Sequence, residues 1–158
     1  MDTLTIDKHT KLSTIQSWVK AMPEKSGSVK VNSKQLVFHN NGRVMVKNSF
    51  HTHPKLACNG GYQPPSVHDL GTVLNGAIAG KVERHYVLAA QGLYIINVKC
   101  GISTKASDNI LKVARNLRST MQPSSKHHQK WMMLINQVHP RCFHVEYCTW
   151  SQQLHHLN

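Results

Sequence analysis

The sequence predicts a single α/β domain built around one mixed sheet. Three observations lead to this prediction. Short apolar runs typical of strands are interleaved with segments of helical periodicity. Turn signals at Asn40-Asn41-Gly42 and Gln91-Gly92 indicate antiparallel hairpins within the same sheet. The 158 residues suffice for one core, and neither an internal repeat nor a low-complexity segment divides them, so residues 1–158 are treated as one domain.

The N-terminal half is expected to contain a strand, a helix and then further strands. The first strand covers residues 4–6. A helix follows, with apolar residues at helical spacing up to Pro23, which closes it: Leu12, Ile15, Trp18, Val19 and Met22. Short strands are expected at 29–31 and 35–38. The Asn40-Asn41-Gly42 turn then leads into a returning strand over 43–53, which Pro54 ends.

The C-terminal half is expected to contain three helices and three strands. A loop rich in proline and glycine covers 54–65, and Ser66 opens a helix with apolar residues at Leu70, Val73, Leu74, Ala77 and Ile78. Strands are expected at 85–89, 93–98 and 143–149, and helices at 108–121 and 128–138. Trp18 and Trp131 lie on apolar helical faces and are assigned to the core, whereas Trp150 has no assigned place.

The composition indicates a soluble intracellular protein with anionic partners. No apolar run approaches the roughly 18 residues of a membrane span, and the N-terminus lacks the features of a signal peptide. We therefore expect a cytoplasmic location. Nineteen Lys and Arg against seven Asp and Glu give a net charge of +12, which favours nucleic acid or acidic proteins as partners. The basic residues are scattered, so a solvated basic surface explains them equally well.

The motif His51-Thr52-His53 is the first candidate for chemistry. Residues two apart on a strand project from the same face, so both imidazoles can reach one metal ion. With twelve histidines in the chain, about one such pair is expected by chance, so the motif alone is a weak signal. Pro54 directly after the pair places both rings at the end of a strand, where a site can open.

A second motif, Ser66-Val67-His68-Asp69, strengthens the case. Ser66 and Asp69 share a face of the first helical turn, and they also fit a capping box worth roughly 1 kcal/mol. The two interpretations are compatible. Two His and one Asp form a three-ligand set that leaves a position for water, which is typical of catalytic zinc. Glu24, one of only three glutamates, lies after the first helix and is the candidate general base.

The order of these motifs resembles that of the JAMM/MPN+ zinc metallopeptidases over roughly residues 3–100. A helix is followed by Glu-x-x-Gly, a strand ending in His-x-His-Pro, and Ser-x-x-Asp opening a helix. The resemblance implies a three-layer α/β/α fold with a mixed sheet, related to the cytidine deaminases. It also implies that His51, His53 and Asp69 bind Zn²⁺, that Glu24 acts as general base, and that Ser66 stabilises the oxyanion.

The implied activity is hydrolysis of a peptide or isopeptide bond, as in the deubiquitinases of this family. The implied partner is a protein substrate, ubiquitin-like proteins among them. No long insertion follows Asp69, which makes polyubiquitin the less favoured substrate. The segment 54–65 is longer than is usual in the family, so it is expected to shape or cover the substrate groove. Cys58 in this segment is interpreted as a loop thiol. The alternative is that Cys58 is a fourth zinc ligand, which would make the site inactive.

Two other classes of function compete with the metallopeptidase. A nucleic-acid-binding module, or a structural protein of an assembly such as a virion, would also explain the charge of +12. Base deamination is set aside because the Pro-Cys-x-x-Cys zinc motif is absent and the four cysteines are widely spaced. Five other histidines are assigned to the surface: His68, His127, His128, His155 and His156. For His68, which adjoins the motif, the alternative is a role in supporting the metal ligands.

Overall fold

The computed structural model describes residues 2–54, 62–120 and 124–157, which form a mixed α/β structure with a seven-stranded sheet and five helices. The strands are β1 (Thr3–Ile6), β2 (Ser26–Val31), β3 (Leu36–His39), β4 (Asn48–Thr52), β5 (Arg84–Leu88), β6 (Gly92–Val98) and β7 (Phe143–Thr149). The helices are α1 (Leu12–Lys20), α2 (Val67–Ile78), α3 (Thr104–Thr120), α4 (Ser125–Asn136) and α5 (Trp150–His156). Within these ranges no helix is both long and apolar enough to cross a membrane.

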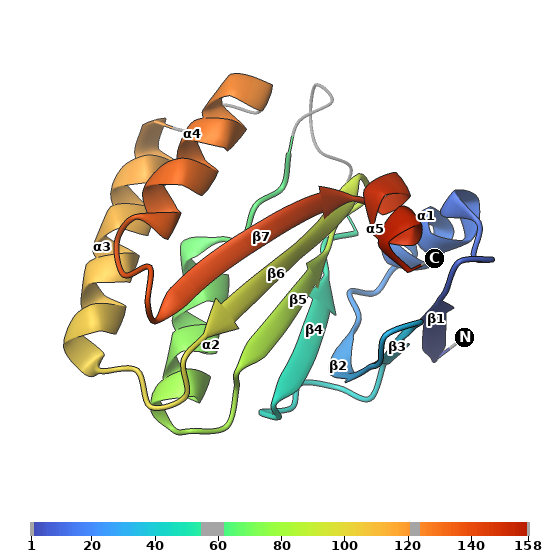
Figure 1. Cartoon of the computed structure of the whole chain (residues 1–158), viewed down its shortest axis with the longest axis horizontal. Coiled ribbons are helices and arrows are strands. Elements are labelled where there is room, and N and C mark those ends of the chain that lie inside the picture. Colours follow the sequence, from blue (N-terminus) through green and yellow to red (C-terminus); the bar gives the residue numbers. More distant parts are fainter. Residues whose placement is uncertain (1, 55–61, 121–123, 158) are drawn as a thin grey trace.

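The sheet has the order β1-β3-β2-β4-β5-β6-β7 and one parallel pair among the described strands, β4 with β5. The other neighbouring pairs are antiparallel. Helix α2 makes the crossover between β4 and β5, as a parallel connection requires. This topology, visible in Figure 1, places the start of α2 beside the end of β4.

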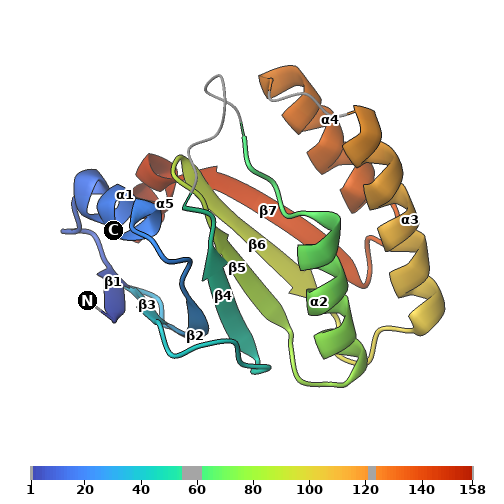
Figure 2. The same ribbon diagram turned by 180° about the vertical axis from the view of Figure 1, so that it is seen from behind.

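Helices cover both faces of the sheet because its central strands are apolar on both sides. In β5, Val87 packs with α2, α3 and α4, whereas its neighbours Tyr86 and Leu88 pack with α1 and α5. In β6, Tyr94 likewise packs with α2, α3 and α4, and its neighbour Leu93 packs with α1 and α5. Figures 1 and 2 show α2, α3 and α4 together on one side and α1 and α5 on the other.

The predicted hairpin at Asn40-Asn41-Gly42 is wrong, as is the long returning strand over 43–53. Strand β4 begins only at Asn48, and it pairs with β2 instead of β3. Side-chain oxygens of Asn40 and Asn41 accept hydrogen bonds from the N–H groups of Ser26 and Ser28, at 3.2 Å each. These bonds attach the segment to β2. The chain therefore does not fold back on β3, and β4 forms on the other side of β2.

The other predicted strands and the four predicted helices are present, with shifted ends. The first helix ends at Lys20, and Met22 is 70% exposed, so this residue lies outside the apolar face assigned to it. Helix α3 begins at Thr104, earlier than expected. Trp18 and Trp131 are buried as predicted.

The C-terminal helix α5 was not anticipated, and it gives Trp150 its place. Thr149 and Gln152 form a capping box at its start. Trp150 is fully buried and donates its indole N–H to the carbonyl of Ala89 at 2.8 Å. His155 and His156 are exposed, as predicted, but the surface assignment of His128 is wrong because this side chain is 5% exposed.

Candidate metal centre

The end of β4 and the start of α2 bring together the side chains of His51, His53 and Asp69. His51 lies in β4 and His53 follows it, so both project toward the face that carries α2. Asp69 lies in the first turn of α2, one turn after the N-cap residue Ser66. These three are the one group of at least three His, Cys, Asp or Glu side chains within the described residues that can hold a metal ion.

The distances between the donor atoms suit a small divalent cation. Nε2 of His51 lies 3.0 Å from Nε2 of His53 and 3.3 Å from Oδ1 of Asp69, and Nε2 of His53 lies 3.2 Å from Oδ2 of Asp69. Tetrahedral zinc with ligands at about 2.0–2.1 Å requires donor separations of roughly 3.3 Å. The three side chains are also only partly exposed, at 12 to 20%. The set therefore fits zinc in both chemistry and spacing.

Asp69 is fixed in its ionised form by its neighbours. Burial alone would raise the pKa of this carboxyl, but hydrogen bonds with His51 and His53 and from the N–H of Ser66 hold it well below its usual range. Its Oδ2 accepts the Ser66 N–H at 2.9 Å, and its own N–H donates to Oγ of Ser66 at 3.0 Å. The predicted capping box is thus present, and the same carboxylate serves both the cap and the donor set.

A chain of hydrogen bonds continues behind His51, and no motif in the sequence predicted it. Nδ1 of His51 lies 2.7 Å from Nε2 of His85, whose Nδ1 lies 2.8 Å from Oγ of Ser49. Burial, and next the charge of His51, lower the pKa of His85 to about 3. His85 is therefore neutral, and its unprotonated ring nitrogen can accept a hydrogen bond. Ligation through Nε2 of His51 then requires that His51 donate to His85 and that His85 donate to Ser49.

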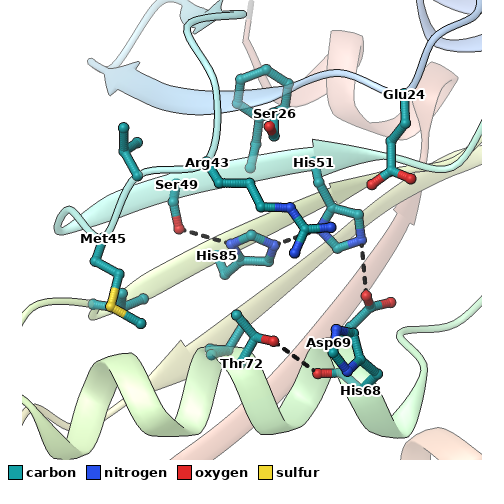
Figure 3. Close-up of a pocket in the computed structure, with 14 residues that line it drawn as sticks. Glu24, Ser26, Arg43, Met45, Ser49, His51, His68, Asp69, Thr72 and His85 are labelled. Atoms are coloured by element: carbon teal, nitrogen blue, oxygen red, sulfur yellow. Dashed lines mark hydrogen bonds and ion pairs between the residues drawn. The ribbon is translucent and has the colours of Figure 1, made fainter.

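Thr52, the residue between the two histidines, attaches the Glu24 segment to the site. Its Oγ1 accepts the N–H of Lys25 at 2.8 Å, and its own N–H donates to the carbonyl of Lys25 at 2.9 Å. Because neighbouring strand residues point to opposite faces, Thr52 is fully buried on the side away from the donor set. Glu24 is therefore held next to His51, and its carboxylate points toward that ring in Figure 3.

One cavity of about 550 Å³ unites all five residues singled out in the sequence. It is lined by Glu24, His51, His53, Ser66 and Asp69, together with Arg43, Tyr62, Gln63, Pro64, His68 and Arg118. Oγ of Ser66 accepts the Asp69 N–H, which leaves its hydroxyl hydrogen available to a ligand. His68 is exposed, as expected, but it also lines this cavity. Cys58, and most of the segment 54–65, lie outside the described residues.

A second cavity of about 270 Å³ adjoins the first on the side of β5. Both cavities are lined by Glu24, His51 and Asp69, so they meet at the donor set. Its other walls combine apolar side chains of α2 and of the segment before β4 with polar ones, among them Arg43, Ser49, Thr72 and His85. Figure 3 shows His85 and Ser49 beneath Arg43, with α2 opposite.

No family model, curated protein or solved structure matches this chain. The functional interpretation therefore depends on the geometry of the site.

Proposed function

We propose that this protein is a zinc-dependent metallopeptidase of the JAMM/MPN+ type that hydrolyses a peptide or isopeptide bond. One observation carries the proposal: a single cavity is lined by a three-donor metal set, a free carboxylate and a hydroxyl donor. These are His51, His53 and Asp69, then Glu24, then Ser66. A structural metal site would be closed by a fourth protein ligand, whereas a catalytic site keeps a position for water.

Each residue has a defined role in amide hydrolysis. His51, His53 and Asp69 hold zinc, which supplies a Lewis acid able to lower the pKa of a bound water to about 7. Glu24 accepts a proton from the attacking water and delivers it to the leaving amine. Ser66 donates its hydroxyl to the oxyanion of the tetrahedral intermediate, a contact typically worth about 3 kcal/mol.

The same proposal includes the three-layer α/β/α fold related to the cytidine deaminases. It is supported by the mixed seven-stranded sheet with helices on both faces. The position of the donor set supports it too, since ligands of α/β sheets commonly bind beyond the carboxyl ends of strands. A protein is the proposed substrate, and ubiquitin-like proteins remain among the candidates.

Metal content is the first test. Protein purified without chelators is expected to contain about one zinc per chain, as a three-ligand site with water predicts. The double variant His51→Ala/His53→Ala should contain little, whereas His155→Ala/His156→Ala, which removes two exposed histidines, should match the unmodified chain. Equal zinc in all three proteins, or none in any, would refute the site.

The mechanism is tested by Glu24→Gln, which keeps the shape of the side chain and removes the base. We expect hydrolysis of a peptide or isopeptide substrate to fall by roughly 10²- to 10⁴-fold while zinc remains bound. Glu83→Gln, at a half-buried glutamate outside the site that pairs with Lys47 at 3.3 Å, is the matched control. Full activity in Glu24→Gln would remove Glu24 from the mechanism.

A second candidate function, binding to nucleic acid or an acidic partner, is favoured by a different observation. The net charge is +12, and α3 exposes the basic side chains of Lys105, Lys112, Arg115 and Arg118. A role within a large assembly such as a virion would use the same surface. Binding of this kind is compatible with hydrolysis at the metal centre, because a basic surface can direct an enzyme to its substrate.

A further inference from the structure

The smaller cavity beside the donor set is mainly apolar, although it opens at a polar centre. We name it the apolar side cavity. Its apolar side chains are Val44, Met45, Val73 and Val82, and polar residues such as Arg43, Ser49, Thr72 and His85 also line it. Three polar residues of the centre, Glu24, His51 and Asp69, form its border toward the larger cavity. A group bound at the donor set can therefore extend directly into the apolar side cavity.

The walls differ in how firmly they are held. Val73 and Val82 are each 3% exposed and belong to α2 and to the turn before β5. Met45, on the segment between β3 and β4, is 47% exposed. The cavity thus has a fixed inner wall and, at Met45, a rim that faces solvent. A bound apolar group would cover this rim and remove it from water.

The volume also limits the class of ligand. About 270 Å³ is enough for a large apolar side chain but not for a folded domain. A glycine next to the scissile bond would leave the space filled with water against apolar walls. Apolar sites of this kind discriminate by size, and burial of a Leu- or Phe-sized side chain typically changes affinity by roughly 10- to 100-fold.

We infer that the apolar side cavity binds a bulky apolar side chain of the substrate, from the residue next to the scissile bond. This inference rests on the proposed function, since the donor set marks where that bond would lie. It defines the substrate class as peptides or isopeptides with Leu, Met or Phe at this position. Substrates with glycine at this position are correspondingly disfavoured.

The test uses zinc-free protein, so that it does not depend on catalysis. Methyl NMR spectra are recorded while N-acetyl-L-phenylalaninamide or N-acetylglycinamide is added. The phenylalanine probe is expected to give saturable shifts at the methyl groups of Met45 and Val73, with a Kd at least tenfold lower than that of the glycine probe. Equal shifts with both probes, or no saturable shift with either, would overturn the inference.

A cavity-blocking variant adds a control for position. Thr72 is exposed on α2 and lines the cavity, so Thr72→Phe should cover it and abolish the shifts at Met45. Asn75→Phe adds the same ring at another exposed position of α2 that does not line the cavity, and it should leave binding unchanged. Undiminished binding in Thr72→Phe would place the probe elsewhere and overturn the inference.

A peptide panel separates this inference from the proposed function. Zinc-loaded protein is given peptides that differ only in Phe, Leu or Gly at one position, and cleavage at that position is expected to be at least tenfold faster for Phe and Leu. Equal cleavage of all three would overturn the cavity inference and leave the metallopeptidase standing. Failure to cleave any peptide or isopeptide would count against the metallopeptidase, while the NMR titration would still decide whether the cavity binds apolar groups.

Discussion

His51 has partners at both of its ring nitrogens, and this determines which nitrogen can bind a metal. Nε2 faces His53 and Asp69, while Nδ1 lies 2.7 Å from His85. An imidazole that donates through Nδ1 keeps its Nε2 lone pair for the metal. His85, held in turn by Ser49, therefore positions His51 and selects its tautomer.

Replacing His85 should weaken zinc binding although this residue does not contact the metal. We expect His85→Phe to reduce zinc affinity by roughly 10- to 100-fold, the usual effect of losing a partner behind a metal-bound histidine. His85→Gln should lose less, because its side-chain oxygen can still accept the Nδ1–H of His51. Zinc affinity is measured by competition with a chromogenic chelator.

His144→Phe, at an exposed position of β7, is the matched control and should bind zinc as the unmodified chain does. The ¹⁵N shifts of the His51 ring add a readout independent of the metal, since loss of His85 should release the Nδ1–H tautomer in zinc-free protein. Unchanged affinity and an unchanged tautomer in folded His85→Phe would show that His85 does not position His51.

The donor set could be predicted from the sequence, but His85 could not. His51 and His53 are two apart on a strand, and Ser66 and Asp69 are three apart at a helix start, so local geometry brings each pair together. His85 reaches the site only because β5 lies parallel to β4 with His85 opposite Ser49. Periodicity within one strand carries no information about the register between two strands.

The start of α2 contributes both to the stability of the helix and to the candidate site. Ser66 caps the helix through its Oγ, and its hydroxyl also faces the cavity that contains the donor set. A single substitution of Ser66 therefore changes two properties. The two effects can be separated because glycine is a tolerable N-cap residue and alanine is a poor one.

We expect Ser66→Ala to lower the free energy of unfolding by about 1 kcal/mol, and Ser66→Gly by only a few tenths. Both variants lack the hydroxyl, so both should lower kcat by about 10²- to 10³-fold. Urea unfolding of zinc-free protein and steady-state kinetics measure the two quantities. Equal stability losses would count against the cap, and wild-type kcat in both variants would count against the oxyanion role.

Helix α4 docks on the sheet through a buried histidine, His128. Its Nε2 forms a hydrogen bond of 2.7 Å with the hydroxyl of Tyr94, and its ring stacks on Tyr62 with centroids 4.0 Å apart. Burial lowers the pKa of His128 to about 4 from an ordinary 6.5. Between these values the unfolded chain binds a proton that the folded chain does not, so the free energy of unfolding falls as pH decreases from 6.5 toward 4.

His128→Phe should reduce this pH dependence. The variant keeps a ring against Tyr62 and removes the titrating group, so the stability lost between pH 7 and 4.5 should be smaller by roughly 2 to 3 kcal/mol. Urea unfolding in the presence of EDTA measures it, and Gln129→Phe, at an exposed position of α4, serves as the control. An identical pH dependence in His128→Phe and the unmodified chain would contradict the assignment.

The elements were predicted correctly where their signals lie within the element itself. The prediction was wrong where pairing with a strand distant in the sequence determines the structure. Helix α2 begins after Ser66 as expected, because its cap and its apolar face lie within the helix itself. The Asn40-Asn41-Gly42 signal failed because β2 offers hydrogen-bond partners to both asparagines. Turn residues specify that the chain changes direction, but tertiary contacts determine which strand the following segment pairs with.

The topology of the sheet explains why the candidate site forms where it does. The parallel pair β4 and β5 requires a crossover, and α2 supplies it. The helix therefore starts at the carboxyl end of β4, where His53 leaves the sheet. A helix N-terminus also carries partial positive charge, which favours the ionised Asp69 in its first turn.

The net charge of +12 is the other property of the whole molecule, and little of it is neutralised internally. Lys47 and Glu83 make the one ion pair between a lysine or arginine and a carboxylate in the described part of the chain. On α3, Lys112 and Arg115 are exposed three residues apart, so they share a face. Such a surface attracts phosphates, with an affinity that depends on counterion release.

We therefore expect the protein to bind a labelled oligothymidylate, with an affinity that falls steeply between 50 and 200 mM salt, as phosphate contacts require. Lys112→Glu/Arg115→Glu should weaken binding and reduce the slope of log K against log salt by about two, one for each lost contact. Lys30→Glu/Lys34→Glu makes the same change of net charge near the β2–β3 turn, at the other end of the molecule in Figure 1, and should reduce the slope less.

EDTA distinguishes this binding from an effect of the metal centre. Phosphate contacts on α3 need no metal, so chelation should leave the anisotropy titration unchanged, whereas binding through the donor set would be lost. Equal losses in the two charge variants would mean that net charge alone attracts the nucleic acid, with no preferred surface. Binding that resists salt would contradict the electrostatic argument, because contacts to phosphate release counterions wherever on the protein they form.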